Sequence, residues 1–250
     1  MGKKKPSADE SWAKGNKWML SYADLVTLLL TFFVLLLVIL NEEEKIIEME
    51  ISKLLSETSD ILEKNINNKN VDINRTDKGV QITLRGDLFP SASSRINKEF
   101  RPLLRQLGGV AINAPLFNVY DESQQKIRQL LLKKLKDGND TLIVELRVEG
   151  HTDELPLPPK IRFRDNWQLS SARALSVVKL LRDETGIPTD KFSALGYGEY
   201  KPTVDVNNLK TSKEKRKARN MNRRVEIILT ASVQDKSNIA RSTLDVSLER

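Results

Sequence analysis

The sequence contains no cysteine and only one histidine, His151, among its 250 residues. The absence of thiols excludes a disulfide-stapled scaffold, a zinc–thiolate site and a catalytic cysteine. With no second His or Cys, a metal site would have to rely on carboxylates, so we interpret His151 as structural and predict neither a metal nor a cofactor. Apolar runs long enough to cross a membrane are also scarce, because the chain has one, near its N-terminus. This distribution predicts a soluble domain attached to one membrane segment.

The apolar block extends from Trp18 to Leu40, with Asp24 as its only charged side chain. A helix of this length rises about 34 Å, which is enough to cross a hydrocarbon core of about 30 Å. A cleavable signal peptide usually has an apolar stretch of only about 7–15 residues, followed by small residues. Here the block is longer and ends in Asn41-Glu42-Glu43-Glu44. We therefore predict an uncleaved transmembrane helix over residues 18–40.

Charges on the two sides of this block differ in sign. Five lysines precede it, and acidic residues follow it directly. Basic residues favour the cytoplasmic side of a membrane segment. The pattern predicts a basic cytoplasmic tail over residues 1–17 and the export of everything after Leu40.

The segment after the membrane block has helical periodicity. Its apolar positions are Ile46, Ile47, Ile51, Leu54, Leu55, Ile61 and Leu62. This spacing predicts an amphipathic helix that continues the membrane helix outward. Residues 65–77 are rich in Asn and have no apolar period, which is typical of a linker. We assign residues 41–78 to this helix and linker, residues 79–230 to a folded domain, and residues 231–250 to a flexible tail.

Strands and helices alternate in the folded domain. Apolar and polar residues alternate from Gly79, and further strands are expected over 141–149, 191–196 and 223–230. Helices are expected near 97–107, over 120–136 and over 166–184, the last closed by Gly186 and Pro188. The order predicts an α/β (α+β) fold in which a mixed sheet is covered by helices on one face.

Asp24 is the first candidate functional residue. A charge inside a spanning helix costs about 2.5–3.5 kcal/mol on insertion scales, so it persists where it faces protein, water or a function. This carboxylate could load and release a proton, or hold a sodium ion together with neighbouring oxygens. The nearby hydroxyls are Ser21, Tyr22, Thr27 and Thr31. The alternative is that Asp24 reaches back to the cytoplasmic surface.

The membrane block resembles the membrane helix of MotB-type stator subunits of the flagellar motor. The resemblance is carried by Trp18, by Tyr22-Ala23-Asp24, by Thr27-Leu28-Leu29 and by Phe32-Phe33. It implies that Asp24 carries H+ or Na+, and that the chain dimerises and works with a multispan MotA-type subunit and, indirectly, the rotor. It also implies a single-pass protein of the bacterial inner membrane whose C-terminal domain is periplasmic.

The exported domain resembles the OmpA-like peptidoglycan-binding domain over roughly residues 79–230. The matching motifs are Gly150-His151-Thr152-Asp153, Asn166 to Ala174, Gly196-Tyr197-Gly198-Glu199 and Asn222 to Glu226. The resemblance implies that Asp153 and Arg173 hold the diaminopimelate side chain of the stem peptide. An acceptor and a planar donor fork suit the ammonium and carboxylate of such a group. The other implied peptidoglycan-binding residues are Thr152, Asn166, Leu169, Asn222 and Arg223. The alternative is an Asp–Arg salt bridge that only braces the fold.

These observations predict the peptidoglycan-anchored subunit of an ion-driven motor stator that generates torque for motility. A passive OmpA-like envelope tether, or the same stator module driving a non-flagellar machine, remains an alternative. By the resemblance, the helix at 46–62 is expected to act as a plug that blocks ion flow, and a dimerising coiled coil is the other interpretation.

Two further interpretations are less favoured by the sequence. The basic run from Lys210 to Arg224 could suggest nucleic-acid binding. An exported domain meets no nucleic acid, so we expect a solvated loop there. Ser170, Ser171 and His151 could suggest nucleophilic catalysis, but both serines stand at the start of a predicted helix, where they fit capping. We therefore predict no hydrolase or other enzyme activity.

Overall fold

The computed structural model describes residues 17–119 and 126–237. The chain divides into two compact units, residues 1–49 and residues 50–250, and each is described by itself. Three predictions fall outside the described residues, wholly or in part. These are the basic tail (1–16), the start of the helix expected over 120–136 (120–125) and most of the C-terminal tail (238–250).

The first unit is dominated by the start of helix α2, which is continuous from Lys17 to Asn65. No glycine or proline interrupts this stretch, so nothing in the backbone favours a break. Its segment Trp18–Ile39 is long and apolar enough to cross a membrane, and its side chains are exposed. The prediction that the membrane helix continues into the amphipathic segment is confirmed.

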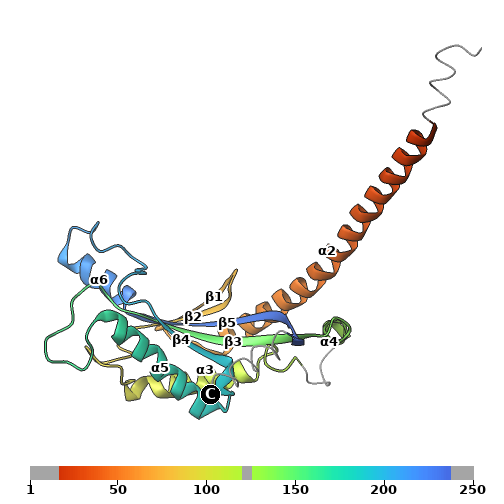
Figure 1. Cartoon of the computed structure of the whole chain (residues 1–250). Coiled ribbons are helices and arrows are strands. Elements are labelled where there is room, and N and C mark those ends of the chain that lie inside the picture. The colour runs from red at the N-terminus through yellow and green to blue at the C-terminus, as the bar shows by residue number, and fades with distance from the viewer. Residues whose placement is uncertain (1–16, 120–125, 238–250) are drawn as a thin grey trace, which may run out of the picture. The chain divides into compact units, whose positions relative to one another are not determined.

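The second unit is built on a five-stranded sheet with the order β1-β2-β5-β3-β4 (Figure 1). The strands are β1 (Val71–Thr76), β2 (Gly79–Arg85), β3 (Asp140–His151), β4 (Phe192–Gly196) and β5 (Arg224–Asp235). β3 and β4 are parallel, and the other neighbouring pairs are antiparallel. The predicted mixed sheet is therefore confirmed.

Helices α3 (Arg101–Ile112) and α5 (Asn166–Thr185) lie on the same side of the sheet, as Figure 1 shows. α5 connects the parallel strands β3 and β4 and packs on both, and α3 packs on α5. The largest fully buried side chains include Leu104, Leu107, Leu146, Leu181, Ile227 and Leu229. Burial of this apolar surface drives the formation of the layer. The remaining helices are the short η1 (Lys98–Phe100) and η2 (Thr189–Lys191), α4 (Lys126–Asp137) and α6 (Ser212–Asn222).

The last turns of α2 are part of the second unit. Leu54, Leu55 and Leu62 are buried there, as are Thr58 and Ser59. In the same region, the side-chain amide of Gln106 donates a hydrogen bond to the carbonyl of the last α2 residue. The C-terminal half of the apolar stripe is therefore already covered within the folded domain, whereas Ile46, Ile47 and Ile51 are only half-buried.

Three boundaries differ from the sequence prediction. The expected linker contains strand β1, an edge strand that pairs with β2 through a tight turn at Asp77-Lys78. β5 continues to Asp235, so the start of the expected flexible tail is ordered by its pairing with β3. The basic run expected as a loop contains α6, whose start is fixed by a capping box between Thr211 and Glu214.

Candidate peptidoglycan-binding cleft

The start of α5 lies directly against the end of β3. At Gly150 a Cβ atom would stand 2.1 Å from the backbone oxygen of Ser170, so only glycine permits this approach. Gly150 is two residues before Thr152 and three before Asp153, and Ser170 is three residues before Arg173. The close packing thus brings the two polar motifs of the sequence to one edge of the sheet.

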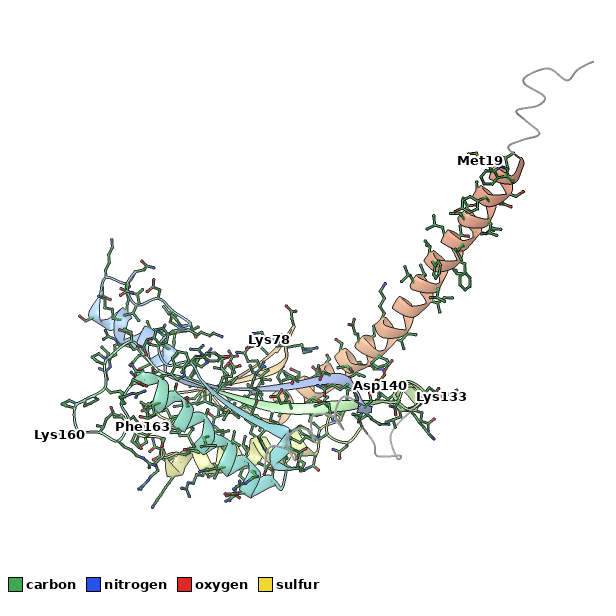
Figure 2. All side chains as sticks on the ribbon, in the orientation of Figure 1. Met19, Lys78, Lys133, Asp140, Lys160 and Phe163 are labelled. Atoms are coloured by element: carbon green, nitrogen blue, oxygen red, sulfur yellow. The ribbon has the colours of Figure 1, made fainter. Side chains whose placement is uncertain are left out.

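The loop between β3 and α5 is held at both ends. The carboxylate of Asp165 caps α5 by accepting a hydrogen bond from the backbone N–H of Gln168 at 2.8 Å. The Asn166 amide donates to the carbonyls of Leu155 (2.9 Å) and Asp153 (3.4 Å), which fixes the loop's first residues. Lys160 and Phe163, labelled in Figure 2, lie on this loop, far from Asp140 at the opposite end of β3.

A cavity of about 340 Å³ opens between this loop, the segment after β2 and the start of α5. It is lined by Asp87, Phe89, Ser91, Ala92, Thr152, Asp153, Leu155, Pro156, Leu157, Pro158, Asn166, Leu169, Arg173 and Arg223. Six of the seven predicted peptidoglycan-binding residues are in this set. Half of the lining residues are apolar and half are polar or charged, so the cavity is suited to a polar, charged ligand.

Asp153 forms an ion pair with Arg223 inside the cavity. The Asp153 Oδ2 atom lies 2.6 Å from Arg223 Nη1, and the carboxylate is mostly buried while the arginine is partly exposed. The sequence predicted both residues in the site, but it joined Asp153 functionally to Arg173. The structure places Arg173 in the same cavity and bonds it elsewhere.

Arg173 is a buried cation held by backbone carbonyls. Its Nε donates to the carbonyl of Ser93 (3.0 Å) and its Nη2 to that of Pro90 (3.4 Å). The guanidinium also lies over the ring of Phe89, 5.1 Å from its centroid. Burial and, to a smaller extent, the charge of Arg223 lower the pKa of Arg173 to about 10, so the group is still protonated at neutral pH. A fixed positive charge with little access to water is suited to bind a carboxylate.

Thr152 brings an unsatisfied hydroxyl to the same cavity. Its side-chain oxygen is buried and has no hydrogen-bond partner among the described residues. A buried hydroxyl without a partner is costly, and a bound polar ligand would remove the cost. Leu169 supplies apolar wall beside it.

Asn222 is the predicted site residue that does not line the cavity. Its side-chain oxygen accepts hydrogen bonds from the backbone N–H groups of Thr203 (2.9 Å) and Val204 (3.0 Å). Its amide nitrogen donates back to the carbonyl of Val204. In this structure the residue organises the loop before α6.

The segment after β2 also lines the cavity, which the sequence pattern did not predict. Phe89 contacts the Arg173 guanidinium, and Pro90 supplies it with a carbonyl acceptor. Proline offers a partial signal, because it has no backbone N–H to donate and nearby carbonyls are left free to accept hydrogen bonds. The stretch 155–158, which contains Pro156 and Pro158, is also part of the cavity wall, and its place there depends on tertiary packing.

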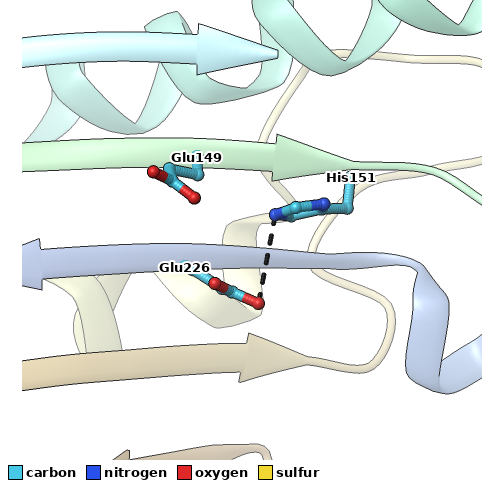
Figure 3. Close-up of side chains that lie close together, drawn as sticks. All are labelled: Glu149, His151 and Glu226. Carbon is cyan, nitrogen blue, oxygen red and sulfur yellow. Dashed lines mark ion pairs between the residues drawn. The ribbon is translucent and has the colours of Figure 1, made fainter. Parts of the chain in front are cut away.

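His151 lies close to Glu149 and Glu226, as Figure 3 shows. The imidazole is buried and stacks on Tyr197 with 5.3 Å between ring centroids. Its Nε2 is 3.9 Å from Glu226. Burial, together with the positive charge of Arg224, lowers the pKa of His151 to about 4, so the ring is neutral at pH 7.

These three side chains place potential metal-ligand atoms within 4.8 Å of one another. Both carboxylates are already engaged, because Glu149 pairs with Arg147 at 3.1 Å and Glu226 with Arg224 at 2.5 Å. A cation would have to compete with two arginines for them. The cluster is accordingly best described as a buried charge network.

In the first unit, the hydroxyls around Asp24 divide between two sides of the helix. Thr27 and Thr31 lie three and seven residues beyond Asp24, and Ser21 three residues before it, so they share its face. The Thr27 hydroxyl donates to the Asp24 carbonyl at 2.8 Å, and Thr31 makes the same kind of bond one turn later. Tyr22 is two residues from Asp24, about 200° around the helix, so it faces the other way.

In the comparison with known proteins, the N-terminal part of the chain and the folded domain match two different families. Residues 2–56 match the family model of the membrane MotB of the proton-channel complex MotA/MotB. Residues 117–219 match the model of the OmpA family. The first match contains Asp24, and the second contains Asp153 and Arg173.

Among curated proteins, the uncharacterized protein YtxE of Bacillus subtilis (strain 168) is 27% identical over 226 residues, which span 87% of this chain and 89% of YtxE. Motility protein B of the same organism is 28% identical over 155 residues, 62% of this chain. That alignment spans only 46% of motility protein B, less than half of its length.

Among solved structures, a MotB-like protein from Desulfovibrio vulgaris superposes with a TM-score of 0.53. The match has 17% sequence identity and covers 76% of this chain and 99% of that one. At this identity the likeness establishes the fold. The two family matches and the alignment to motility protein B, together with this fold, support a MotB-type protein with an OmpA-like domain.

Proposed function

We propose that this protein is the peptidoglycan-anchored subunit of an ion-driven stator. In this proposal Asp24 carries H+ or Na+ in a pathway shared with a multispan MotA-type subunit, and a dimer of this chain is fixed to the wall by its OmpA-like domain. The domain binds the wall without cleaving it. One apolar helix with one carboxylate cannot enclose an ion path, so a partner is needed on physical grounds.

The observation that carries the anchoring part is the composition of the cleft. The cavity offers a mostly buried carboxylate at Asp153, a buried cation at Arg173 and an unsatisfied hydroxyl at Thr152. A diaminopimelate end carries an ammonium and a carboxylate close together, and these match the two charges. The Thr152 hydroxyl can form a hydrogen bond to the peptide.

The stator part is supported by Asp24 within the apolar segment. A tether needs only an apolar helix, and a carboxylate there weakens insertion without any benefit. Ser21, Thr27 and Thr31 give the Asp24 face a polar stripe, which suits a surface that borders a partner or a water path and not lipid.

The test is Asp24→Asn, produced together with the MotA-type subunit. The variant should be expressed, inserted and assembled as the wild type is, and ion flux and rotation should be abolished, because the amide cannot take up or release a proton. Asp24→Glu should retain part of the activity. Glu48→Gln is the matched control, since Glu48 is an exposed acid on the same helix beyond the apolar segment.

Normal flux or rotation in Asp24→Asn would contradict the stator and favour the passive tether. Replacement of Na+ by K+ at constant pH identifies the transported ion, because flux through a sodium path stops and flux through a proton path continues.

A further inference from the structure

A second cavity, of about 500 Å³, lies beside the start of α5 and the turn that contains Glu199 and Tyr200. It is lined by Arg164, Asp165, Asn166, Trp167, Gln168, Ser171, Glu199 and Tyr200. Asn166 lines this cavity and also the cleft that contains Asp153 and Arg173. The two cavities are therefore neighbours that share Asn166 as a lining residue.

Two exposed aromatic rings form the apolar part of this cavity. Trp167 is 53% exposed and Tyr200 is 68% exposed, although both are large side chains that folding normally covers. Their ring centroids are 5.5 Å apart and their planes are tilted by 49°. The pair thus presents two differently oriented flat faces to solvent.

Backbone contacts place Trp167 next to the turn that carries Tyr200. The hydroxyl of Ser170 donates to the carbonyl of Trp167 (2.9 Å) and accepts from the N–H of Gly198 (2.9 Å). Gly198 has φ of +55°, and a Cβ there would stand 3.3 Å from the Trp167 nitrogen. The turn that carries Tyr200 can therefore lie close against the first turn of α5, which brings the two aromatic residues together.

The remaining lining groups are polar and nearly balanced in charge. Arg164 pairs with the carboxylate of Asp165 at 3.2 Å, and Glu199, Gln168 and Ser171 complete the polar lining. A polyanion would meet two carboxylates against one guanidinium. An uncharged ligand with apolar faces and many hydroxyl or amide groups fits this surface better.

We propose that Trp167 and Tyr200 form a subsite for the glycan strand of peptidoglycan. Sugar rings have C–H faces that stack on aromatic side chains, and their hydroxyl and N-acetyl groups can bond to the polar rim. Two tilted rings suit two successive sugars, which are rotated relative to each other. This inference rests on the proposed wall binding, because a stem peptide held at Asp153 and Arg173 brings its own glycan to the adjacent surface.

The experiment measures two ligands separately with the full-length chain in detergent. The first ligand is soluble glycan strands freed of stem peptides by an amidase, and the second is the free stem peptide that ends in diaminopimelate. Trp167→Ala and Tyr200→Ala should each weaken glycan binding about tenfold and leave stem-peptide binding unchanged. The matched control is Leu175→Ala, which removes an exposed apolar side chain from the same helix outside this cavity. Thermal unfolding of each variant verifies that the fold is intact.

The outcomes separate this inference from the function on which it rests. If the wild type binds the stem peptide but not the glycan, or if both aromatic variants bind glycan as the wild type does, the subsite is wrong and wall anchoring stands. If the wild type binds neither ligand, the proposed function itself fails, and the subsite fails with it. Glycan binding that is lost equally in the Leu175→Ala control would also overturn the assignment.

Discussion

The Asp153 carboxylate lies 2.6 Å from the guanidinium of Arg223, and the cationic Arg173 lines the same cavity without bonding to it. The cleft thus holds one carboxylate and two cations, and the carboxylate is paired with only one of them. A ligand ammonium that enters the cleft must approach a carboxylate that already has a partner. The site is therefore a coupled set of three charges, and its members should not act independently.

Asp153→Asn is expected to weaken binding to purified sacculi about thirtyfold to several-thousandfold. This range corresponds to the loss of about 2–5 kcal/mol when one member of a buried charged contact is removed. The Arg223→Gln variant should bind more weakly than the wild type but better than Asp153→Asn. It keeps the Asp153 carboxylate and removes only the guanidinium that holds this carboxylate in position. Pull-down of the full-length chain on sacculi measures all variants, and Asp183→Asn, an exposed acid near the end of α5, is the control.

A double-mutant cycle tests the coupling. The effects of Asp153→Asn and Arg223→Gln should deviate from additivity by more than about 0.5 kcal/mol. Strict additivity would show that the ion pair does not contribute to binding. Wild-type binding by folded Asp153→Asn and Arg173→Ala variants would place the peptide site elsewhere.

The stability of the domain should fall when the pH drops from about 6.5 to about 4. Burial lowers the pKa of His151 to about 4, so between these values the unfolded chain binds a proton that the folded chain does not. The stabilisation is complete above the unfolded pKa of about 6.5 and decreases as the pH falls toward 4. The expected loss is on the order of 2 kcal/mol, after allowance for solvent screening.

His151→Phe provides the comparison. Phenylalanine can keep the ring stacked on Tyr197 and does not titrate. Chemical denaturation at pH 7 and pH 4.5 should show a smaller pH effect in this variant than in the wild type. An equal effect in both proteins would assign the acid sensitivity to other groups.

Gly150→Ala is expected to destabilise the domain by about 1–3 kcal/mol, the usual cost of overpacking a tight contact. The added Cβ would stand 2.1 Å from the Ser170 carbonyl oxygen, and backbone atoms on both sides would have to move. Gly109→Ala is the matched control, because nothing lies within 4 Å of a Cβ in that helical position. The free energy of unfolding of the Gly109→Ala control should rise by about 0.5–1 kcal/mol, since alanine is the better helix former. Urea unfolding of both variants decides the comparison.

Deletion of residues 46–52 tests whether the helix at 46–62 acts as a plug that blocks ion flow. Seven residues are about two helical turns, so the phase of the helix is nearly kept, and Leu54 and Leu55, which are buried in the folded domain, remain. A plug predicts ion leakage and slowed growth when the deletion variant is overproduced with its partner subunit, and Asp24→Asn should suppress the leak. A coiled coil instead predicts loss of the dimer without a leak. An unchanged internal pH and growth rate would exclude the plug.

Elements with strong apolar periodicity were predictable from the sequence. β2, β3 and α5 have buried stripes with the periods of their structures, and Gly186 ends α5 with φ of +72° as the Gly-Pro signal indicated. β1 was missed because it is an edge strand. Its stability comes from pairing with β2 on one side, so its six residues need little apolar character.

The start of α6 left a signal in the sequence, whereas two long-range contacts near the cleft left none. Thr211 and Glu214 have the spacing of a capping box, which marks the start of α6 within the basic run. The Trp167–Tyr200 contact joins residues far apart in the chain, and neither of their local patterns indicates the other. The same holds for the pairing of Asp153 with Arg223. Both residues could be placed in the site by motif, but the choice between two arginines depends on tertiary packing.

The pairing of β3 with β5 has a mechanical consequence. All 12 residues of β3 are paired with β5, Asp153 follows the end of β3, and Arg223 directly precedes the start of β5. A pull on a ligand held at Asp153 would reach both strands from the same end and in the same direction, because Arg223 is paired with Asp153. Such a force does not pull β3 and β5 away from each other, so it puts little load on the hydrogen bonds between them. The β3–β5 pairing should therefore persist when force is applied at the cleft.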